Sequence, residues 1–123
     1  MINNKKKLFL HGGSSLISKY LLRKFFHEFD EFYIFCRNIS KTKSIIEFEK
    51  YNNKDFFFFE NDLNDFNSTL EDLKKLPDDF SAIFWITGYT GNPEDEYLNL
   101  ELISKNLNIN FYNAVLSLTY LSK

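Results

Sequence analysis

The segment 11-HGGSSLIS-18 decides the fold that this sequence predicts, because it joins two stretches of different hydrophobic period. Before it, 8-LFL-10 is typical of a short buried strand, and after it, 19-KYLLRKFF-26 repeats its apolar residues at helical spacing. Gly12 and Gly13 allow positive φ values and close approach of another group to the backbone. The segment therefore predicts a strand-to-helix turn, and it raises the question of whether a ligand sits on it.

Two interpretations fit the turn. Ser14 and Ser15, together with the N–H groups of the helix's first turn, can hold a phosphate against the positive end of the helix dipole. In the alternative, the serines only cap the helix, which needs the same residues. The segment alone does not decide between a phosphate-binding loop and a capped turn.

The composition argues against several classes of protein. The chain has 123 residues, 44% hydrophobic and 26% charged, with a net charge of -2, which fits one globular domain without a basic field for nucleic acid. Its apolar runs fall short of the roughly 20 residues that a membrane span requires. Cys36 is the single cysteine, which excludes an internal disulfide and favours a reducing compartment. We expect a soluble, cytoplasmic protein with neither nucleic acid nor membrane as a partner.

Short apolar runs alternate with longer amphipathic ones along the whole chain. The pattern predicts strands at 7–11, 32–36, 55–60 and 80–87, and helices at 15–29, 40–51, 66–75 and 95–121. Several of these strands are almost continuously apolar, as in parallel sheets covered on both faces. Residues 1–123 are therefore expected to form one α/β domain, a doubly wound parallel sheet in a three-layer α/β/α arrangement. This is an incomplete Rossmann fold.

In such a sheet the residues that follow each strand meet at one edge, where ligands bind. The predicted helix 15–29 is expected to turn one mostly apolar stripe toward the sheet. The members of that stripe are Leu16, Tyr20, Leu21, Lys24, Phe25 and Phe29.

The segment 11-HGGSSLIS-18 resembles the TGxxxGxG loop of the short-chain dehydrogenase/reductase family, often written TGASSGIG. Gly12 matches its first glycine, whereas Leu16 and Ser18 replace the second and third. A side chain at 16 is expected to crowd a bound pyrophosphate, and Ser18 to loosen helix–strand packing. The resemblance implies that the phosphates of a nicotinamide dinucleotide face Gly12, Gly13, Ser14, Ser15 and Ile17.

The segment 36-CRN-38 resembles the point at the end of the second strand where this family selects its cofactor. An acidic residue there binds the ribose 2′-hydroxyl, whereas Arg37 can pair with a 2′-phosphate through its planar guanidinium. The resemblance therefore implies NADP in preference to NAD. In the alternative, Arg37 is a solvated loop residue.

After the third predicted strand, 61-NDLND-65 resembles the family's D-[LV] pair, which implies that Asp62 accepts from the adenine amino group and that Leu63 lies beside the ring. The alternative makes the polar residues of this segment turn formers, with Asp65 capping the next helix.

At the end of the fourth predicted strand, 84-FWITGY-89 lies where the family carries NNAG. The resemblance implies that the backbone at Gly88 passes close to the ribose.

The segment 106-NLNINFYNAVLSL-118 resembles the family's fourth helix, where an asparagine between apolar residues holds a water in a proton relay. Asn110 takes that place and is the one candidate catalytic residue. An asparagine buried in an apolar helix needs a reason, because an unpaired amide costs about 1–3 kcal/mol. In the alternative, Asn110 caps a kink or binds backbone.

The resemblance implies hydride transfer between the nicotinamide and a small-molecule carbonyl or alcohol substrate. The family's catalytic Ser and Tyr-x-x-x-Lys are missing, and 20-YLLRK-24, which has that spacing, lies on the first helix. We therefore expect no turnover by these residues alone. His11 is expected to be structural, and no metal-ligand spacing appears.

The resemblance also implies a homo-oligomer, because the family's fourth helix commonly packs against a partner subunit. A second class of function stays open, namely a nucleotide-binding or regulatory βα domain without chemistry, or a degenerate remnant that binds nothing. Leu16, Ser18, Trp85 and Ile86 favour this alternative.

Overall fold

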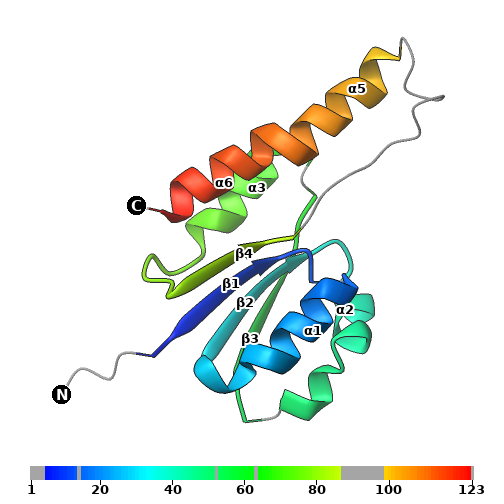
Figure 1. Ribbon diagram of the computed structural model, residues 1–123. Helices are drawn as coiled ribbons and strands as arrows, with labels where there is room; N and C mark the ends of the chain where they lie inside the picture. The colour runs from blue at the N-terminus through cyan, green and yellow to red at the C-terminus, as the bar shows by residue number, and fades with distance from the viewer. Residues whose placement is uncertain (1–4, 14, 52, 63, 87–98, 123) are drawn as a thin grey trace.

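The computed structural model describes residues 5–13, 15–51, 53–62, 64–86 and 99–122, arranged as helices on both sides of a sheet (Figure 1). The strands are β1 (Lys7–His11), β2 (Glu31–Cys36), β3 (Asp55–Glu60) and β4 (Ala82–Trp85). The α-helices are α1 (Leu16–Phe25), α2 (Ile39–Ile45), α3 (Phe66–Lys74), α5 (Leu100–Leu107) and α6 (Asn113–Leu121). Two 3-10 segments, Phe26–Glu28 and Phe48–Tyr51, follow α1 and α2, and a π-helical turn, Asn108–Tyr112, joins α5 to α6.

The four strands are parallel and follow the order β3-β2-β1-β4. The chain moves outward from β1 to β3 and then returns to the other side of β1, so the direction of winding reverses between β1 and β4. This confirms the predicted doubly wound parallel sheet. Ligands of such sheets bind at the carboxyl ends of the strands, beside the reversal.

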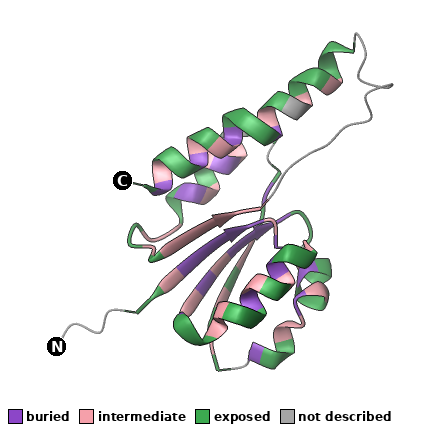
Figure 2. Cartoon of the chain, viewed as in Figure 1, coloured by how far each residue is buried: buried purple, intermediate pink, exposed green. Residues whose placement is uncertain are grey.

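The two faces of the sheet carry separate apolar clusters. On β1, Leu8 and Leu10 pack with Leu22 of α1, whereas the intervening Phe9 packs with Leu73 of α3 and Leu121 of α6. Side chains alternate across a strand, so each face receives every second residue. Helices α1 and α2 cover one face and α3 and α6 the other, which confirms the three-layer arrangement (Figures 1 and 2).

The predicted buried stripe of the first helix is wrong in its first half, although Phe29 lies in the core and Phe25 packs against it. Ser18 and Leu22 are fully buried, whereas Leu16 and Tyr20 are 66% and 59% exposed. The helix begins at Leu16 after the Ser15 cap, and the small Ser18 lets its first turn approach the end of β1. The buried face is therefore rotated away from the largest side chains of the predicted stripe.

The predicted boundaries hold best for the strands. Residues 7–11 and 55–60 match β1 and β3, and β2 begins one residue earlier than expected. The strand expected at 80–87 is shorter, because β4 spans only Ala82–Trp85. The predicted helix 40–51 ends at Ile45 because Glu47 adopts a left-handed φ of 56°, after which the chain forms a 3-10 turn. The predicted start of the last helix lies outside the described residues, and its body is interrupted by the π-helical turn.

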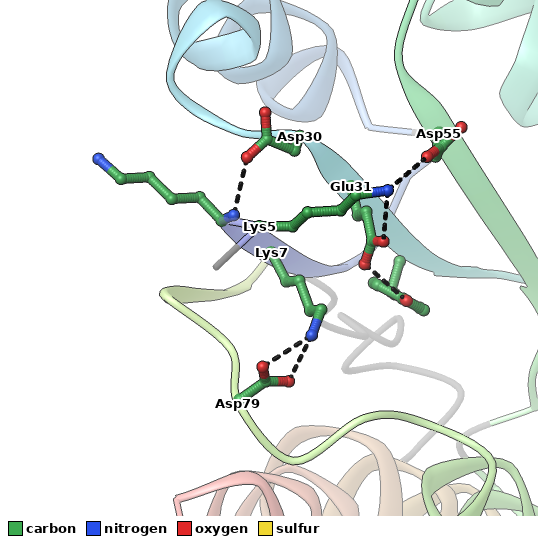
Figure 3. Close-up of polar contacts among 8 residues, drawn as sticks. Lys5, Lys7, Asp30, Glu31, Asp55 and Asp79 are labelled. Atoms are coloured by element: carbon green, nitrogen blue, oxygen red, sulfur yellow. Dashed lines mark hydrogen bonds and ion pairs between the residues drawn. The ribbon is translucent and has the colours of Figure 1, made fainter. Parts of the chain in front are cut away.

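Charged side chains link the amino ends of the strands, at the edge opposite the glycine turn (Figure 3). Lys5 Nζ lies 3.8 Å from both Glu31 Oε1 and Asp55 Oδ2, and Lys7 Nζ lies 2.7 Å from Asp79 Oδ2. The side chains of Lys5, Asp55 and Asp79 are exposed, whereas those of Glu31 and Lys7 are 13% and 18% exposed. The pair between Lys5 and Asp55 is exposed on both sides, and pairs of that kind contribute little to stability. They connect the start of β1 with the first residues of β2 and β3 and with the segment before β4, away from the carboxyl edge.

Within the described residues, no helix is both long and apolar enough to cross a membrane. Over the same residues, no cluster of histidine, cysteine and carboxylate side chains could hold a metal ion.

We predict that Gly13→Ala destabilises the fold by about 1–3 kcal/mol, as expected for overpacking. A Cβ at this position would lie 2.6 Å from Ile34 Cγ2 and 2.8 Å from Thr42 Cγ2, so β2 or α2 must shift. Urea unfolding measures the change. The control is Ser44→Ala on the exposed side of α2, where a change within about 0.5 kcal/mol is expected. Equal stability of the two variants would contradict the packing argument.

Candidate nucleotide-binding site

The predicted ligand residues converge on the carboxyl edge of the sheet. Gly12 directly follows β1, Arg37 directly follows β2, and Asp62 lies two positions after the end of β3. Since these strands are parallel neighbours, the three residues share one edge. The predicted residues Ser14, Leu63 and Gly88 lie outside the described residues.

Gly12 makes the turn from β1 into α1 possible. Its φ is 100°, a value that residues with a side chain rarely adopt. The Gly12 N–H donates to Phe35 O at 3.1 Å, and Gly12 O accepts from Ser15 N at 3.1 Å and from Ser18 Oγ at 2.6 Å. The turn is thereby tied both to the neighbouring strand and to the helix that it starts.

Gly13 has a packing role beneath the turn. The residue is buried, and its N–H donates to Phe35 O at 3.4 Å, the same carbonyl that Gly12 uses. Ile34 and Thr42 occupy the space where a side chain would stand. The glycine pair thus lets β1, β2 and α2 approach one another closely.

Ser15 caps α1, as the sequence suggested. Its Oγ accepts from the N–H of Ile17 at 3.1 Å, which satisfies one of the free donors at the head of the helix. Leu16 and Ile17 are 66% and 63% exposed beside this cap. The expectation that Leu16 crowds a bound pyrophosphate stays a prediction.

Ser18 joins the helix to the turn, where the sequence had suggested looser packing. It is fully buried, and its hydroxyl donates to Gly12 O. A glycine at position 18 has no hydroxyl. Of the two donors described here, Gly12 O would then keep only the Ser15 N–H. The departure from the family's third glycine thus adds a hydrogen bond to the turn.

Arg37 is exposed at the end of β2 and precedes the cap of α2. The next residue, Asn38, accepts from Lys41 N at 2.9 Å through its side chain and fixes the start of that helix. The guanidinium therefore projects from a well-defined backbone at the carboxyl edge, where it is accessible to an anion.

Asp62 and Asp65 have the geometry of the turn-and-cap alternative. Asp62 is exposed, and its Oδ1 accepts from Asn64 N at 2.9 Å. Asp65 Oδ1 accepts from Ser68 N at 3.1 Å at the head of α3. The contact between Asp62 and adenine stays a prediction.

Asn61 is the residue of the site whose importance the sequence did not predict. The alternative interpretation made it a turn residue. It is 3% exposed, and its Oδ1 lies 3.2 Å from His11 Nε2. Its Nδ2 donates to Asp72 Oδ2 at 3.1 Å. No local pattern marks it, because the partners are 50 and 11 positions away.

His11 is structural, as predicted, and it is neutral. Burial lowers its pKa from 6.5 to about 4, although the hydrogen bond with Asn61 acts in the opposite direction. Because the unfolded chain binds a proton at higher pH than the folded one, His11 reduces stability as the pH falls from 6.5 toward 4.

Asn110 lies in the π-helical turn and is exposed, so the expectation of a buried asparagine is wrong. The extra residue of the turn shifts the helix register, and Asn113 occupies the buried stripe instead. Nearby, Asn108 Nδ2 donates to Asn64 Oδ1 at 3.2 Å and ties the turn to the loop after β3. Turns of this type are frequent at functional sites.

The pair with Tyr-x-x-x-Lys spacing lies on the outer surface of α1. Tyr20 is 59% exposed, and the Arg23 guanidinium lies 5.5 Å from the centre of its ring. Neither Tyr20 nor Lys24 belongs to the buried face of the helix.

No protein-family model matches the chain, and no curated protein matches it. Several solved structures, however, match the chain in fold. A short-chain type dehydrogenase/reductase from Mycobacterium ulcerans is 14% identical, with 99% of this chain and 47% of that chain covered and a TM-score of 0.76. A short chain dehydrogenase from Burkholderia cenocepacia in complex with NADP is 14% identical, with 95% and 49% covered and a TM-score of 0.77. The chain has the fold of short-chain dehydrogenases/reductases.

A third short-chain dehydrogenase/reductase neighbour in fold is YwfH, an NADPH dependent reductase involved in bacilysin biosynthesis. It is 17% identical, with 97% of this chain and 52% of that chain covered and a TM-score of 0.75. The chain thus spans about half the length of these structures. At such low identity, the likeness establishes the Rossmann-type fold of this family and leaves the roles of individual residues as proposals.

We predict that Ser18→Ala lowers stability by about 1–3 kcal/mol, because Gly12 O loses a buried hydrogen-bond donor. Urea unfolding of the variant checks the value. The control is Ser104→Ala on the exposed part of α5, which should differ little from the parent. A stability loss no larger than that of the control would show that this hydrogen bond does not hold the turn.

Proposed function

We propose that the chain binds a nicotinamide dinucleotide, NADP in preference to NAD, and supplies the cofactor-binding part of a short-chain dehydrogenase/reductase. The glycine turn at the head of α1, beside the reversal of strand order, is the observation that carries the proposal. The similarity in fold to an NADP complex and to an NADPH dependent reductase supports it.

The head of α1 can accommodate a phosphate if one hydrogen bond within the protein is replaced by a hydrogen bond to the phosphate. Ile17 N–H now donates to Ser15 Oγ, and both residues stand at the positive end of the helix dipole. A phosphate oxygen can accept from Ile17 N–H while the Ser15 hydroxyl turns to donate to the same anion. Gly12 and Gly13 direct their N–H groups toward Phe35 O, so they support the proposed phosphate site from the side of the sheet.

The remaining proposed contacts come from residues that follow the carboxyl ends of the strands. Arg37 pairs with the 2′-phosphate, for which its exposed guanidinium is suited. Asp62 is proposed to accept from the adenine amino group. Ser14 is assigned to the phosphates, Leu63 to the adenine ring and Gly88 to the ribose, on the resemblance alone.

For the whole protein we propose oxidoreduction of a small carbonyl or alcohol substrate. The bound cofactor supplies or takes the hydride. Asn110, in the π-helical turn, is proposed to position a water for proton transfer, on the resemblance alone. Cofactor binding, rather than turnover, is the activity to test on these residues.

The second candidate function is that of a nucleotide-binding or regulatory domain without chemistry, or of a remnant that binds nothing. The hydrogen bonds of the turn favour it, since Gly12 N, Gly13 N, Ser15 N and Ile17 N all have partners within the protein. Titration with NADPH separates the cofactor-binding domain from the remnant, because a remnant keeps these bonds and stays unliganded.

We also propose a homo-oligomer formed through the last helix, and a cytoplasmic location in keeping with the buried, free Cys36. Helix α5 is almost entirely exposed (Figure 2), and apolar side chains stand exposed along α5, the π-helical turn and α6. They are Leu100, Ile103, Leu107, Phe111, Tyr112, Val115 and Leu118. A surface of this kind is typical of an interface.

We predict that NADPH binds in the micromolar range and that Arg37→Asp weakens binding by at least about tenfold, since a charge-assisted pair is replaced by repulsion. NADH affinity should hold or rise, because NADH has no 2′-phosphate and an acidic residue at this position can accept from its ribose 2′-hydroxyl. Isothermal titration calorimetry measures both affinities. The control is Arg23→Asp, the same charge change at an exposed residue of α1. No binding of NADPH by the parent protein would favour the second candidate.

We predict that Phe111→Glu shifts the protein toward the monomer, because Phe111 is 56% exposed and a carboxylate there cannot be buried at an interface without a partner. Sedimentation velocity measures the assembly state. Ser104→Glu, at an exposed polar residue of α5, serves as the control. A parent protein that sediments as a monomer at all accessible concentrations would rule out this interface.

A further inference from the structure

A buried side-chain bridge at the carboxyl edge connects the end of β1 with the loop after β3, although these two strands are not neighbours in the sheet. His11 is the last residue of β1, and Asn61 follows the last residue of β3. Strand β2 lies between β1 and β3, so the bridge between His11 Nε2 and Asn61 Oδ1, 3.2 Å long, spans the intervening strand. Both side chains are almost fully buried.

The network determines which nitrogen of His11 carries its proton. Asn61 Nδ2 donates to Asp72 Oδ2 at 3.1 Å, and an ionised carboxylate can only accept. The Asn61 Oδ1 atom therefore faces His11 and accepts from it. Because burial lowers the His11 pKa to about 4, the ring is neutral near pH 7 and bears its proton on Nε2.

Aromatic rings fix the plane of the imidazole. The Trp85 ring lies at a centroid distance of 4.4 Å, and the Phe35 ring stands edge-on at 5.6 Å. The main chain at Asn61 is also anchored, since its N–H donates to Cys36 O at 2.8 Å. Rotation of either His11 or Asn61 would thus break contacts on several elements.

The residues next to this pair are the proposed ligand contacts. Gly12, which makes the phosphate-facing turn, follows His11, and Asp62, the proposed adenine contact, follows Asn61. We propose that His11 and Asn61 are positioning residues that hold the loop after β1 and the loop after β3 at the separation a dinucleotide's adenosine half requires. The ligand part of this inference rests on the proposed function, whereas the bridge is a property of the free protein.

The first test is made on the ligand-free protein. Nitrogen-15 NMR of the His11 ring near pH 7 should show the Nε2–H tautomer. In Asn61→Leu the His11 pKa should fall further, because the hydrogen bond that raises it is lost. A ring protonated on Nδ1, or a pKa that does not move, would overturn the bridge.

The second test measures NADPH affinity. His11→Phe keeps an aromatic ring beside Trp85 but removes the donor, and it should weaken binding by at least about tenfold. His11→Gln presents an amide donor near the Nε2 position and should restore most of the affinity. Asn61→Leu should resemble His11→Phe, and the double variant should bind no worse than either single variant, because both remove one contact.

The outcomes separate this inference from the proposed function. If the parent protein binds no NADPH, the proposed function fails, and the bridge is judged by the His11 tautomer and by hydrogen exchange in the loop after β3. If NADPH binds equally well to His11→Phe, or if the two single effects add, the positioning role is wrong. If His11→Phe does not fold, Asn61→Leu and the tautomer of the parent protein decide.

Discussion

The left-handed turn at Gly12 is the constraint on which the carboxyl edge depends. A φ of 100° directs the Gly12 carbonyl back toward α1, where the Ser15 N–H and the Ser18 hydroxyl both donate to it. The same turn places the N–H groups of Gly12 and Gly13 on Phe35 O of β2. One backbone conformation therefore aligns the head of α1 with the sheet, and a helix head so placed is the part of the fold suited to an anion.

Beneath this edge a hydrogen-bonded polar network is buried, and above it polar side chains are exposed. His11, Asn61 and Asp72 form a network that links β1, the loop after β3 and α3. Arg37 and Asp62 stand outside it, in solvent. Such a division suits binding, because a rigid base presents accessible side chains in fixed positions and reduces the ordering that a ligand must impose.

The π-helical turn gives the last helix two different faces. Its buried stripe, Ile109, Asn113, Ser117 and Leu121, recurs every four residues against α3 and the sheet. The extra residue of the turn brings Phe111 to the surface and leaves Asn110 exposed. The same local irregularity thus lies within the apolar surface proposed for assembly and contains the asparagine proposed for chemistry.

The sequence by itself determined the order of elements, the parallel sheet and the glycine turn with its serine cap, because these depend on residue periodicity and on backbone preferences within a few positions. Strands β1 and β3 were therefore predicted to the residue. Only the tertiary structure decided that Ser18 and Leu22, rather than Leu16 and Tyr20, face the sheet, and that Asn61 is a buried partner of His11. Such contacts join residues far apart in the chain, and packing geometry rather than local pattern determines them.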